Sequence, residues 1–552
     1  MKASASSTSR TSDLSATRRK SLKSLLHIPL LPRNDDIAQQ RITSNARSTR
    51  GTSVPADIIL SIADWLAPCD VLNLSLTSRA VRSLLIPALY ATVVLKSSRQ
   101  CRVALTALLE QPAVCATVRK LAVRPNYYLA WPKPDEHLDE QWVVDAIIRI
   151  APKLTGLHTF DWDGLEMPED YLWPALRQFC PQLRTVYSNV GSKPLDPESQ
   201  LFNFTNLTSF SLIVRHGLGG SDLFPTAEEL PERLWDMLLN KCPDLEEISI
   251  CSFSSSARLF SFDQITSARW PKLHTLTLGS FGYTSDFLIS QPSDDALSGF
   301  LAAHQALKHV RLSWNFKRWI SPETIPLSLP ETALPELKTY IGIYQQLAQL
   351  PNPAAIETLD LTCEPIYEMR VADICPVLRS LTALTSLDVW VYIPSPGNDY
   401  YSFFQLIIGS CPTLKELHFM CTTSFTSKPL KQLSSLLRLL PDLKTFTLTK
   451  GHKYRDESML QSALRIIKDN PGLTQVNIRS AREKCPNHLK QEGAYEVKSN
   501  ADGVPSVLVA HERGLTVVGR SFERQYEVEL NPRGKFGALK QQTAVQRPSA
   551  RI

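Results

Sequence analysis

The chain has 552 residues, too many for one compact core, and its 43% hydrophobic and 21% charged content allows most of it to fold. The formal charge of +6 is concentrated at one end, because residues 1–50 hold ten Lys or Arg and three Asp (10 − 3 = +7), which leaves the rest near −1. Phosphate binding needs a concentrated basic face, so a nearly neutral body argues against nucleic acid as the principal ligand.

No run approaches 18 consecutive apolar residues, and the first thirty residues are rich in serine, so we expect neither a membrane span nor a secretory signal. The eleven cysteines form no Cys-x-x-Cys pair or Cys/His cluster, which argues against a disulfide framework and against a zinc site. Reduced cysteines fit the cytosol or the nucleus. Five of them precede a proline: Cys180, Cys242, Cys375, Cys411 and Cys485.

Both ends of the chain have the composition of disordered tails. Residues 1–50 are rich in Ser, Thr, Arg and Lys and poor in aromatics, so they cannot bury enough surface to order themselves. The basic run at residues 17–23 is typical of a solvated tail, and a nuclear signal or a phosphorylation site is the alternative. Residues 532–552 look like a shorter tail of the same kind.

Residues 54–90 predict three short helices, because their apolar positions follow a helical period. We expect Pro68 to end the first helix, Asp70 to cap the second, and Ser78 to cap a third that stops before Pro87. Three such helices make a core too small to stand alone, so this unit should need a partner.

From about residue 115 to residue 480 the pattern apolar-x-x-apolar-x-apolar recurs. Its alternating apolar residues predict a short strand with one buried face, and about twenty further residues allow a helix to return, as at 401–408 and 431–440. The clear copies begin at Leu245, Leu273, Leu307, Ile356, Leu384, Leu414, Leu443 and Leu473, and weaker ones at Val118, Leu157, Leu183, Leu207 and Leu337.

Each such unit leaves its faces open, so neighbouring units must stack, and parallel strands are expected at 245–250, 273–278, 307–312, 384–389, 414–419, 443–448 and 473–478. The alternative is an ordinary α/β domain with coincidental apolar triplets. We expect the Cys-Pro pairs to lie where a returning helix ends, with the cysteine as a small apolar filler. After the last copy the period changes to two, and residues 485–531 predict a β-rich cap with a turn at 500–503.

Residues 54–59 read Val-Pro-Ala-Asp-Ile-Ile, residues 66–79 read Leu-Ala-Pro-Cys-Asp-Val-Leu-Asn-Leu-Ser-Leu-Thr-Ser-Arg, and residues 87–90 read Pro-Ala-Leu-Tyr. This segment resembles the F-box motif, and the repeats resemble the leucine-rich class found in many F-box proteins. The resemblance implies an α/β chain with an F-box at 51–95, a leucine-rich-repeat solenoid at 115–484 and the β-rich cap at 485–531.

The resemblance further implies a substrate receptor of an SCF-type ubiquitin ligase in the cytoplasm or nucleus. The F-box would dock on a Skp-type adaptor, which links to a cullin and a RING subunit, while the solenoid holds a protein substrate. The family motif assigns docking, or its support, to Pro55, Ile58, Ile62, Leu66, Leu72 and Leu76. Two alternatives stay open: an F-box scaffold outside a ligase, and an enzyme with an unrecognised site in residues 215–300.

A receptor needs no catalytic residues, and we expect no enzyme activity, cofactor, metal, nucleic acid or membrane partner. Residues 217–221 (Gly-Leu-Gly-Gly-Ser) lack the Lys-Ser/Thr of a phosphate loop, which favours a mobile loop. Asp161 and Asp163 flank Trp162 at alternate strand positions, where we expect them to face solvent.

Substrate should bind the concave side of the strands, where the polar positions between the apolar ones point. The candidates are Asp161, Arg311, Ser313, Asp360, Asp388, Trp390, His418, Thr447 and Arg479. Trp390 is the candidate aromatic anchor, and the alternative is that it packs against a neighbouring side chain.

Overall fold

A computed structural model describes residues 54–530, apart from 127–136, 215–229, 253–259, 262, 283–293, 315–326, 395–398, 422, 424, 452–456, 483–484, 501–503 and 516–520. The two tails and the loop at 217–221 therefore lie outside the described residues, as does most of the turn at 500–503. The chain divides into two units, Met1–Ile62 and Ala63–Ile552.

Three helices are present between residues 54 and 90: α1 (Ala56–Trp65), α2 (Pro68–Ser75) and α3 (Arg79–Tyr90). Ser78 caps α3 as predicted, since its Oγ accepts a 3.1 Å hydrogen bond from the Val81 N–H. Two expectations were wrong. Asp70 lies in the first turn of α2 after the cap Ala67 and does not cap it; Pro68 follows the end of α1 as expected and is also the first residue of α2, where its missing N–H costs nothing. Pro87 lies inside α3, where it removes the hydrogen bond that a backbone N–H would donate to the Ser83 carbonyl.

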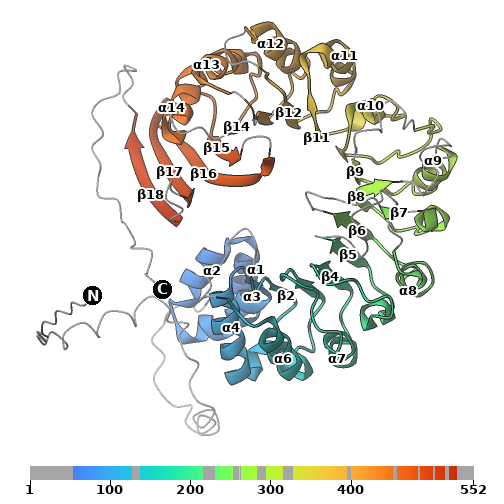
Figure 1. Cartoon of the computed structure of the whole chain (residues 1–552). Helices are drawn as coiled ribbons and strands as arrows, with labels where there is room; N and C mark the ends of the chain where they lie inside the picture. Colours follow the sequence, from blue (N-terminus) through green and yellow to red (C-terminus); the bar gives the residue numbers. More distant parts are fainter. Residues whose placement is uncertain are drawn as a thin grey trace, which may run out of the picture. The chain divides into compact units, whose positions relative to one another are not determined.

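The second unit is built on one long, mostly parallel sheet, the repeat solenoid that the spacing predicts. Each strand pairs in parallel with the next along the chain, except that β6 pairs with β8 and the short β7 pairs beside β8. All seven segments expected as parallel strands are parallel (Figure 1). The parallel strands are β1 (Thr92–Leu95), β2 (Lys120–Val123), β3 (Thr159–Trp162), β4 (Thr185–Val190), β5 (Ser209–Val214), β6 (Glu247–Ser252), β7 (Phe260–Ser261), β8 (Thr275–Gly282), β9 (His309–Trp314), β10 (Thr339–Ile341), β11 (Thr358–Ile366), β12 (Ser386–Val391), β13 (Glu416–Cys421), β14 (Thr445–Gly451) and β15 (Gln475–Arg482).

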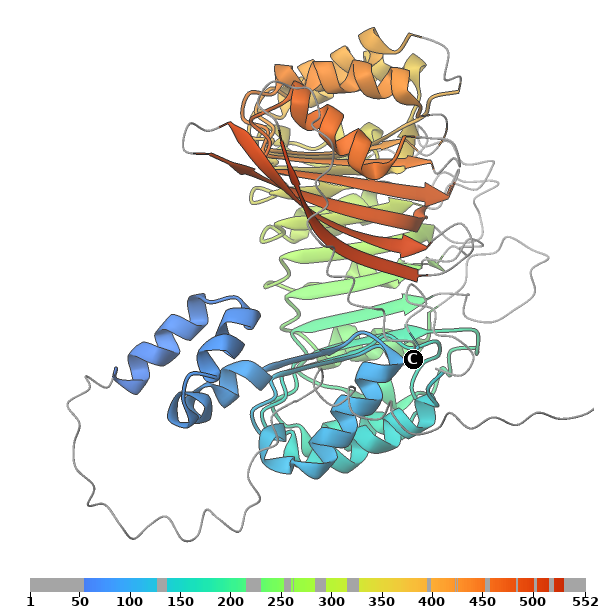
Figure 2. The same ribbon diagram turned by 90° about the vertical axis from the view of Figure 1, so that its left-hand side faces the viewer.

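From α4 onward the helices lie along the outer side of the sheet, and the strands line its inner side (Figures 1 and 2). The expected helices near 401–408 and 431–440 are α12 and α13, the second closed by a 3-10 turn at Leu437–Leu439. The helices after α3 are α4 (Ser98–Glu110), α5 (Pro112–Cys115), α6 (Glu140–Ile150), α7 (Leu172–Phe179), α8 (Glu232–Asp236), α9 (Asp294–Ala303), α10 (Tyr344–Leu347), α11 (Val371–Ser380), α12 (Tyr401–Gly409), α13 (Ser427–Leu436) and α14 (Met459–Asp469).

The core lies between strands and helices and repeats from one unit to the next. Leu387, Leu417, Phe446 and Val476 are successive register partners on β12 to β15, and all four are buried. Burying a side chain of this size stabilises a fold by about 1.5–3 kcal/mol. Because each repeat covers the apolar face of its neighbour, the ladder stabilises the stack as a whole.

The Cys-Pro pairs follow the expectation only in part. Cys180 and Cys411 lie where α7 and α12 end, and both are buried fillers. Cys375 is also buried, but Cys375 and Pro376 lie inside α11, and Cys485 begins a strand. A preceding 3-10 turn at Glu368–Arg370 starts this helical segment early, so the proline falls within the helix.

After β15 the same sheet continues with three antiparallel strands, β16 (Cys485–Ser499), β17 (Pro505–Leu515) and β18 (Ser521–Glu529). On the side facing the helices they bury the carboxylate of Glu512. It accepts hydrogen bonds from the hydroxyls of Tyr495 (2.6 Å) and Tyr526 (2.8 Å) and from Nε of Arg524 (2.9 Å). The predicted β-rich segment is thus a meander that extends the solenoid sheet.

Candidate partner-binding surface

We call the sheet face turned away from the helices the inner face; its residues alternate with the core residues along each strand. The register places Asp360, Asp388, His418 and Thr447 side by side on β11 to β14. Arg311 on β9 belongs to the same cross-strand row, separated from Asp360 by β10. Five of the candidate substrate residues are therefore brought together in one row.

A second row lies two residues further along the strands. Trp390 is the register partner of Met420, and Thr449 is the partner of Arg479, with Met420 and Thr449 also paired. Ser313 lies in β9, but its side chain is not among those described. The structure does not bring Asp161 to this group, because β4, β5, β6 and β8 lie between β3 and β9.

His418 links the two rows. Its Nδ1 lies 3.0 Å from Oδ2 of Asp388, and its Nε2 lies 2.9 Å from Oγ1 of Thr449. Thr447 is buried and accepts a 3.1 Å hydrogen bond from the Asn477 amide. These contacts fix the side chains before any partner arrives, which lowers the entropy cost of binding.

Trp390 is half-buried, which is neither of the two extremes expected from its position. Its indole N–H is shielded from solvent, yet it has no hydrogen-bond acceptor among the described residues. Beside it, the register of β11 shifts between Leu361 and Ile366. A shielded donor without an acceptor is costly, and a bound partner that offers an oxygen would relieve this cost.

Asp161 and Asp163 are not on the solvated face that the alternation suggests. Asp163 is only 8% exposed, and Arg124 lies between the two carboxylates, 3.4 Å from Asp163 and 3.9 Å from Asp161. Burial raises the pKa of Asp161, and the charge of Arg124 offsets part of that rise. Neighbouring strands crowd this part of the inner face, which the sequence of one strand does not reveal.

Arg479 is held by a residue that the sequence analysis missed. Glu492 on β16 accepts from Nε of Arg479 at 3.1 Å and from Arg513 at 2.6 Å. Burial alone would raise the pKa of Glu492, but the hydrogen bond from Arg513 and the charges of both arginines outweigh it and lower that pKa. The antiparallel register of β15 and β16 creates this contact, and only a strand-pairing prediction would have found it.

The inner face is acidic in its C-terminal half. At the regular inner positions from β10 to β14, the described residues include Asp360, Asp388 and Glu416 but no Lys or Arg. The register-paired positions of the same face on β15 to β18 add Arg479, Lys498 and Arg513 as bases. Its acids are Glu492, Glu496, Glu523, Glu527 and Glu529. The sum over β10 to β18 is 3 − 8 = −5.

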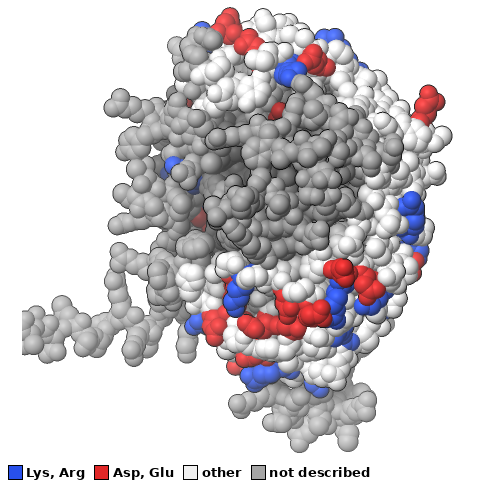
Figure 3. Space-filling view, turned by 45° about the vertical axis from the view of Figure 1, so that its right-hand side comes forward, with Lys and Arg blue, Asp and Glu red and all other residues white. Residues whose placement is uncertain are grey.

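The N-terminal half of the inner face is balanced. Here the acids at register-paired positions are Asp161 and Glu247, and the bases are Lys120 and Arg311, so the sum over β1 to β9 is 2 − 2 = 0. Figure 3 shows charges of both signs interspersed over the described surface in that view. The acidic excess is therefore a property of one half of the inner face.

The predicted adaptor-docking residues are largely in solvent. In α1, Ile58 is 47% and Ile62 46% exposed, and in the second unit Leu76 is 60% exposed. Pro55 and Leu72 are also exposed, whereas Leu66 is half-buried. The analysis did not single out Trp65, which is 89% exposed and forms the end of the first apolar run. Each of these large apolar side chains is thus available for contact with a partner.

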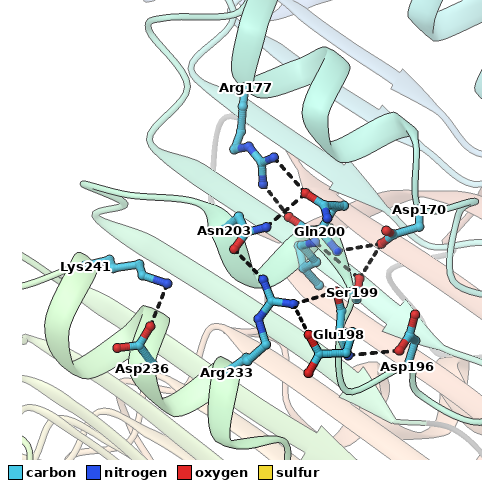
Figure 4. A network of polar contacts seen from close by, with 11 residues as sticks. Asp170, Arg177, Asp196, Glu198, Ser199, Gln200, Asn203, Arg233, Asp236 and Lys241 are labelled. Carbon is cyan, nitrogen blue, oxygen red and sulfur yellow. Dashed lines mark hydrogen bonds and ion pairs between the residues drawn. The ribbon is translucent and has the colours of Figure 1, made fainter.

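A dense polar network on the outer side of the solenoid has a structural role (Figure 4). The guanidinium of Arg177 in α7 donates to the carbonyl and the amide oxygen of Gln200, at 2.5 and 3.1 Å. Arg233 in α8 donates to Glu198 at 2.6 Å and to Asn203 at 2.8 Å. Asp170 accepts from the backbone N–H of Gln200 at 2.8 Å. Because these groups satisfy one another, the network ties consecutive repeats together.

Within the described parts of the chain, no group of three or more His, Cys, Asp or Glu side chains is arranged to hold a metal ion. No helix in those parts is both long and apolar enough to cross a membrane.

No protein-family model matches the chain, and no curated protein matches its sequence. Among solved structures, one described as "Crystal structure of Rad7 and Elc1 complex in yeast" is similar at 11% sequence identity with a TM-score of 0.39. The match covers 74% of this chain and 90% of that one. The complex with Elc1 is described for Rad7 and not for this chain.

Proposed function

We propose that this chain is a substrate-recognition subunit of an SCF-type cullin–RING ubiquitin ligase. Residues 54–90 would dock on a Skp-type adaptor, and the inner face of the solenoid would hold a protein substrate. The observation that carries the proposal is the exposure of Ile58, Ile62, Leu72 and Leu76 at positions where the segment resembles an F-box. Covering these side chains with a partner would remove apolar surface from water at about 25 cal/mol per Å².

In this proposal the chain performs no chemistry of its own and needs neither cofactor nor metal. It accelerates ubiquitin transfer by holding a substrate lysine at high local concentration near the conjugating enzyme. The pre-ordered contacts of His418 and the half-buried Trp390 support the inner face as the substrate side. We place the protein in the cytosol or nucleus as part of the same proposal.

The test is co-purification of a tagged full-length chain with the adaptor and with cullin. Pro55→Ala/Ile58→Ala should abolish adaptor recovery, because it truncates two exposed side chains of the docking segment. Ser61→Ala/Asn73→Ala is the matched control, since it changes two exposed polar residues of α1 and α2. Unchanged adaptor recovery by a folded Pro55→Ala/Ile58→Ala chain would contradict the proposal.

The same experiment separates the ligase from an F-box scaffold. Adaptor recovered together with cullin supports the ligase, whereas adaptor recovered without cullin supports a scaffold that acts outside ubiquitin transfer. An enzyme with a site in residues 215–300 is the third possibility, and much of that range lies outside the described residues.

A further inference from the structure

The inner face between β10 and β15 is a sheet surface on which no described helix lies (Figures 1 and 2). Buried and more exposed residues alternate along β12, and at the start of β13, so the polar side chains there are not needed to bury the repeats. Asp388 and Glu416 are both accessible there, with 38% of the Asp388 side chain in solvent and Glu416 in the exposed class.

The charge of this surface is one-sided. Asp360 and Asp388 are register partners on β11 and β12, one inter-strand distance of about 4.8 Å apart, and Glu416 lies on β13 two residues before His418, the partner of Asp388. The regular inner positions described from β10 to β14 supply no Lys or Arg to neutralise them. The only imidazole among them, His418, is already engaged by Asp388 and Thr449. The meander β16 to β18 extends the acidic excess, whereas β1 to β9 carry none.

Apolar surface accompanies these charges. Trp390 and its register partner Met420 lie next to Asp388 and His418 on the same face. A half-buried indole beside exposed carboxylates suits a partner that brings cationic side chains, because Arg pairs with carboxylates and also stacks on aromatic rings.

We propose that the inner face of β11 to β13 is the docking site for an extended, Lys/Arg-bearing segment of the substrate, with Asp388 and Glu416 as its main charge partners and Trp390 as its ring contact. This inference rests on the proposed function, since it names the substrate class for the same surface. Long-range attraction from the −5 face would speed association, and it would weaken as salt is added.

The probe is a fluorescein-labelled twelve-residue peptide of alternating Arg and Ser, titrated against the purified full-length chain by fluorescence anisotropy. Asp388→Lys/Glu416→Lys should weaken its binding roughly tenfold, because two attractive pairs become repulsive. Asp373→Lys/Asp442→Lys makes the same change in net charge at exposed positions away from the inner face, and should weaken it less than about twofold.

Asp388→Asn/Glu416→Gln is the second test variant, in case the lysine variant does not fold. It keeps the size of both side chains and should still weaken binding of the Arg–Ser peptide roughly threefold. Thermal melts accompany every variant. A matched peptide of alternating Glu and Ser should bind the inner-face lysine variant better than the control variant. No binding of the Arg–Ser peptide to the native chain, or equal losses in both lysine variants, would overturn the proposal.

Two further readouts separate the possible failures. Adaptor co-purification should equal that of the native chain in every one of these variants. If the adaptor co-purifies but Asp388→Lys/Glu416→Lys does not change the affinity for the Arg–Ser peptide, this docking site is wrong and the proposed function stands. If the peptide affinities change as expected but the native chain does not recover the adaptor, the proposed function is wrong. Light scattering measures whether the native chain is a dimer. If it is, and Asp388→Lys/Glu416→Lys makes it a monomer, the occupant of this face is a second copy of the chain and the proposal is overturned.

Discussion

Two pairs of helices in this chain carry apolar side chains along one face, but they bury those side chains to different extents. In α13 and α14, Leu433 and Ile466 are buried between the sheet and the neighbouring repeats. Ile58 in α1, Leu72 in α2 and Leu76 just after α2 remain in solvent. Stacking solves the burial problem for a repeat, because each unit covers the next, whereas a short helical segment has no such neighbour. The difference is why we propose a partner for the short helical segment and none for the helix side of the repeats.

Cysteine labelling should reveal the largest difference between the two regions. Cys69 lies exposed in α2, whereas burial raises the pKa of Cys180 and of Cys411 to about 12. The thiolate is the reactive form, so near pH 8 iodoacetamide should modify these buried cysteines at least about 100-fold more slowly than Cys69. Mass spectrometry of a labelling time course measures the modification rate of each cysteine. Equal rates for Cys69 and the buried cysteines in the folded chain would contradict the difference in burial between the two regions.

The free energy of unfolding should fall by a few kcal/mol more in a variant of the buried repeat helices than in a variant of the exposed segment. Leu433→Ala opens a cavity at a fully buried site and should cost about 3 kcal/mol, while Leu76→Ala, at a 60% exposed site, should cost less than about 0.5 kcal/mol. The thermal midpoints of the two full-length variants provide the measurement. A Leu76→Ala chain that melts as early as Leu433→Ala would mean that this residue supports the fold and not a partner.

A smaller effect is expected at Trp390. Trp390→Ala should weaken substrate capture by about 2 kcal/mol, against less than about 1 kcal/mol for Lys415→Ala, and adaptor binding should stay intact. Trp390→Phe keeps a ring but removes the shielded N–H, so its loss should be intermediate. If the tryptophan only packs within the repeat, Trp390→Ala will lower the melting temperature and all binding will fall together.

The repeat architecture was predictable because its signal is local and redundant. One apolar spacing recurs from Leu245 to Leu473, and every clear copy became a buried strand. The limits of individual helices were less predictable: Pro87 and Pro376 lie inside helices, although proline usually ends one. The β-rich character of residues 485–531 was predictable, and its pairing with β15 was not.

The candidate surface was predictable only as a set of positions. Alternation places Asp388 and His418 on the inner face, but their hydrogen bond depends on the register between two strands thirty residues apart. For the same reason the sequence did not reveal that Arg124 pairs with Asp163, or that Glu492 holds Arg479. Cross-strand neighbours decide which polar groups remain available, and one strand's pattern does not contain them.

Hydrogen exchange with and without a purified Skp-type adaptor tests the central claim most directly. Binding should slow the exchange of backbone amides within residues 54–76, where the exposed apolar side chains lie, and leave strands β10 to β15 unchanged. Protection confined to those strands, or no protection at a saturating adaptor concentration, would contradict the account.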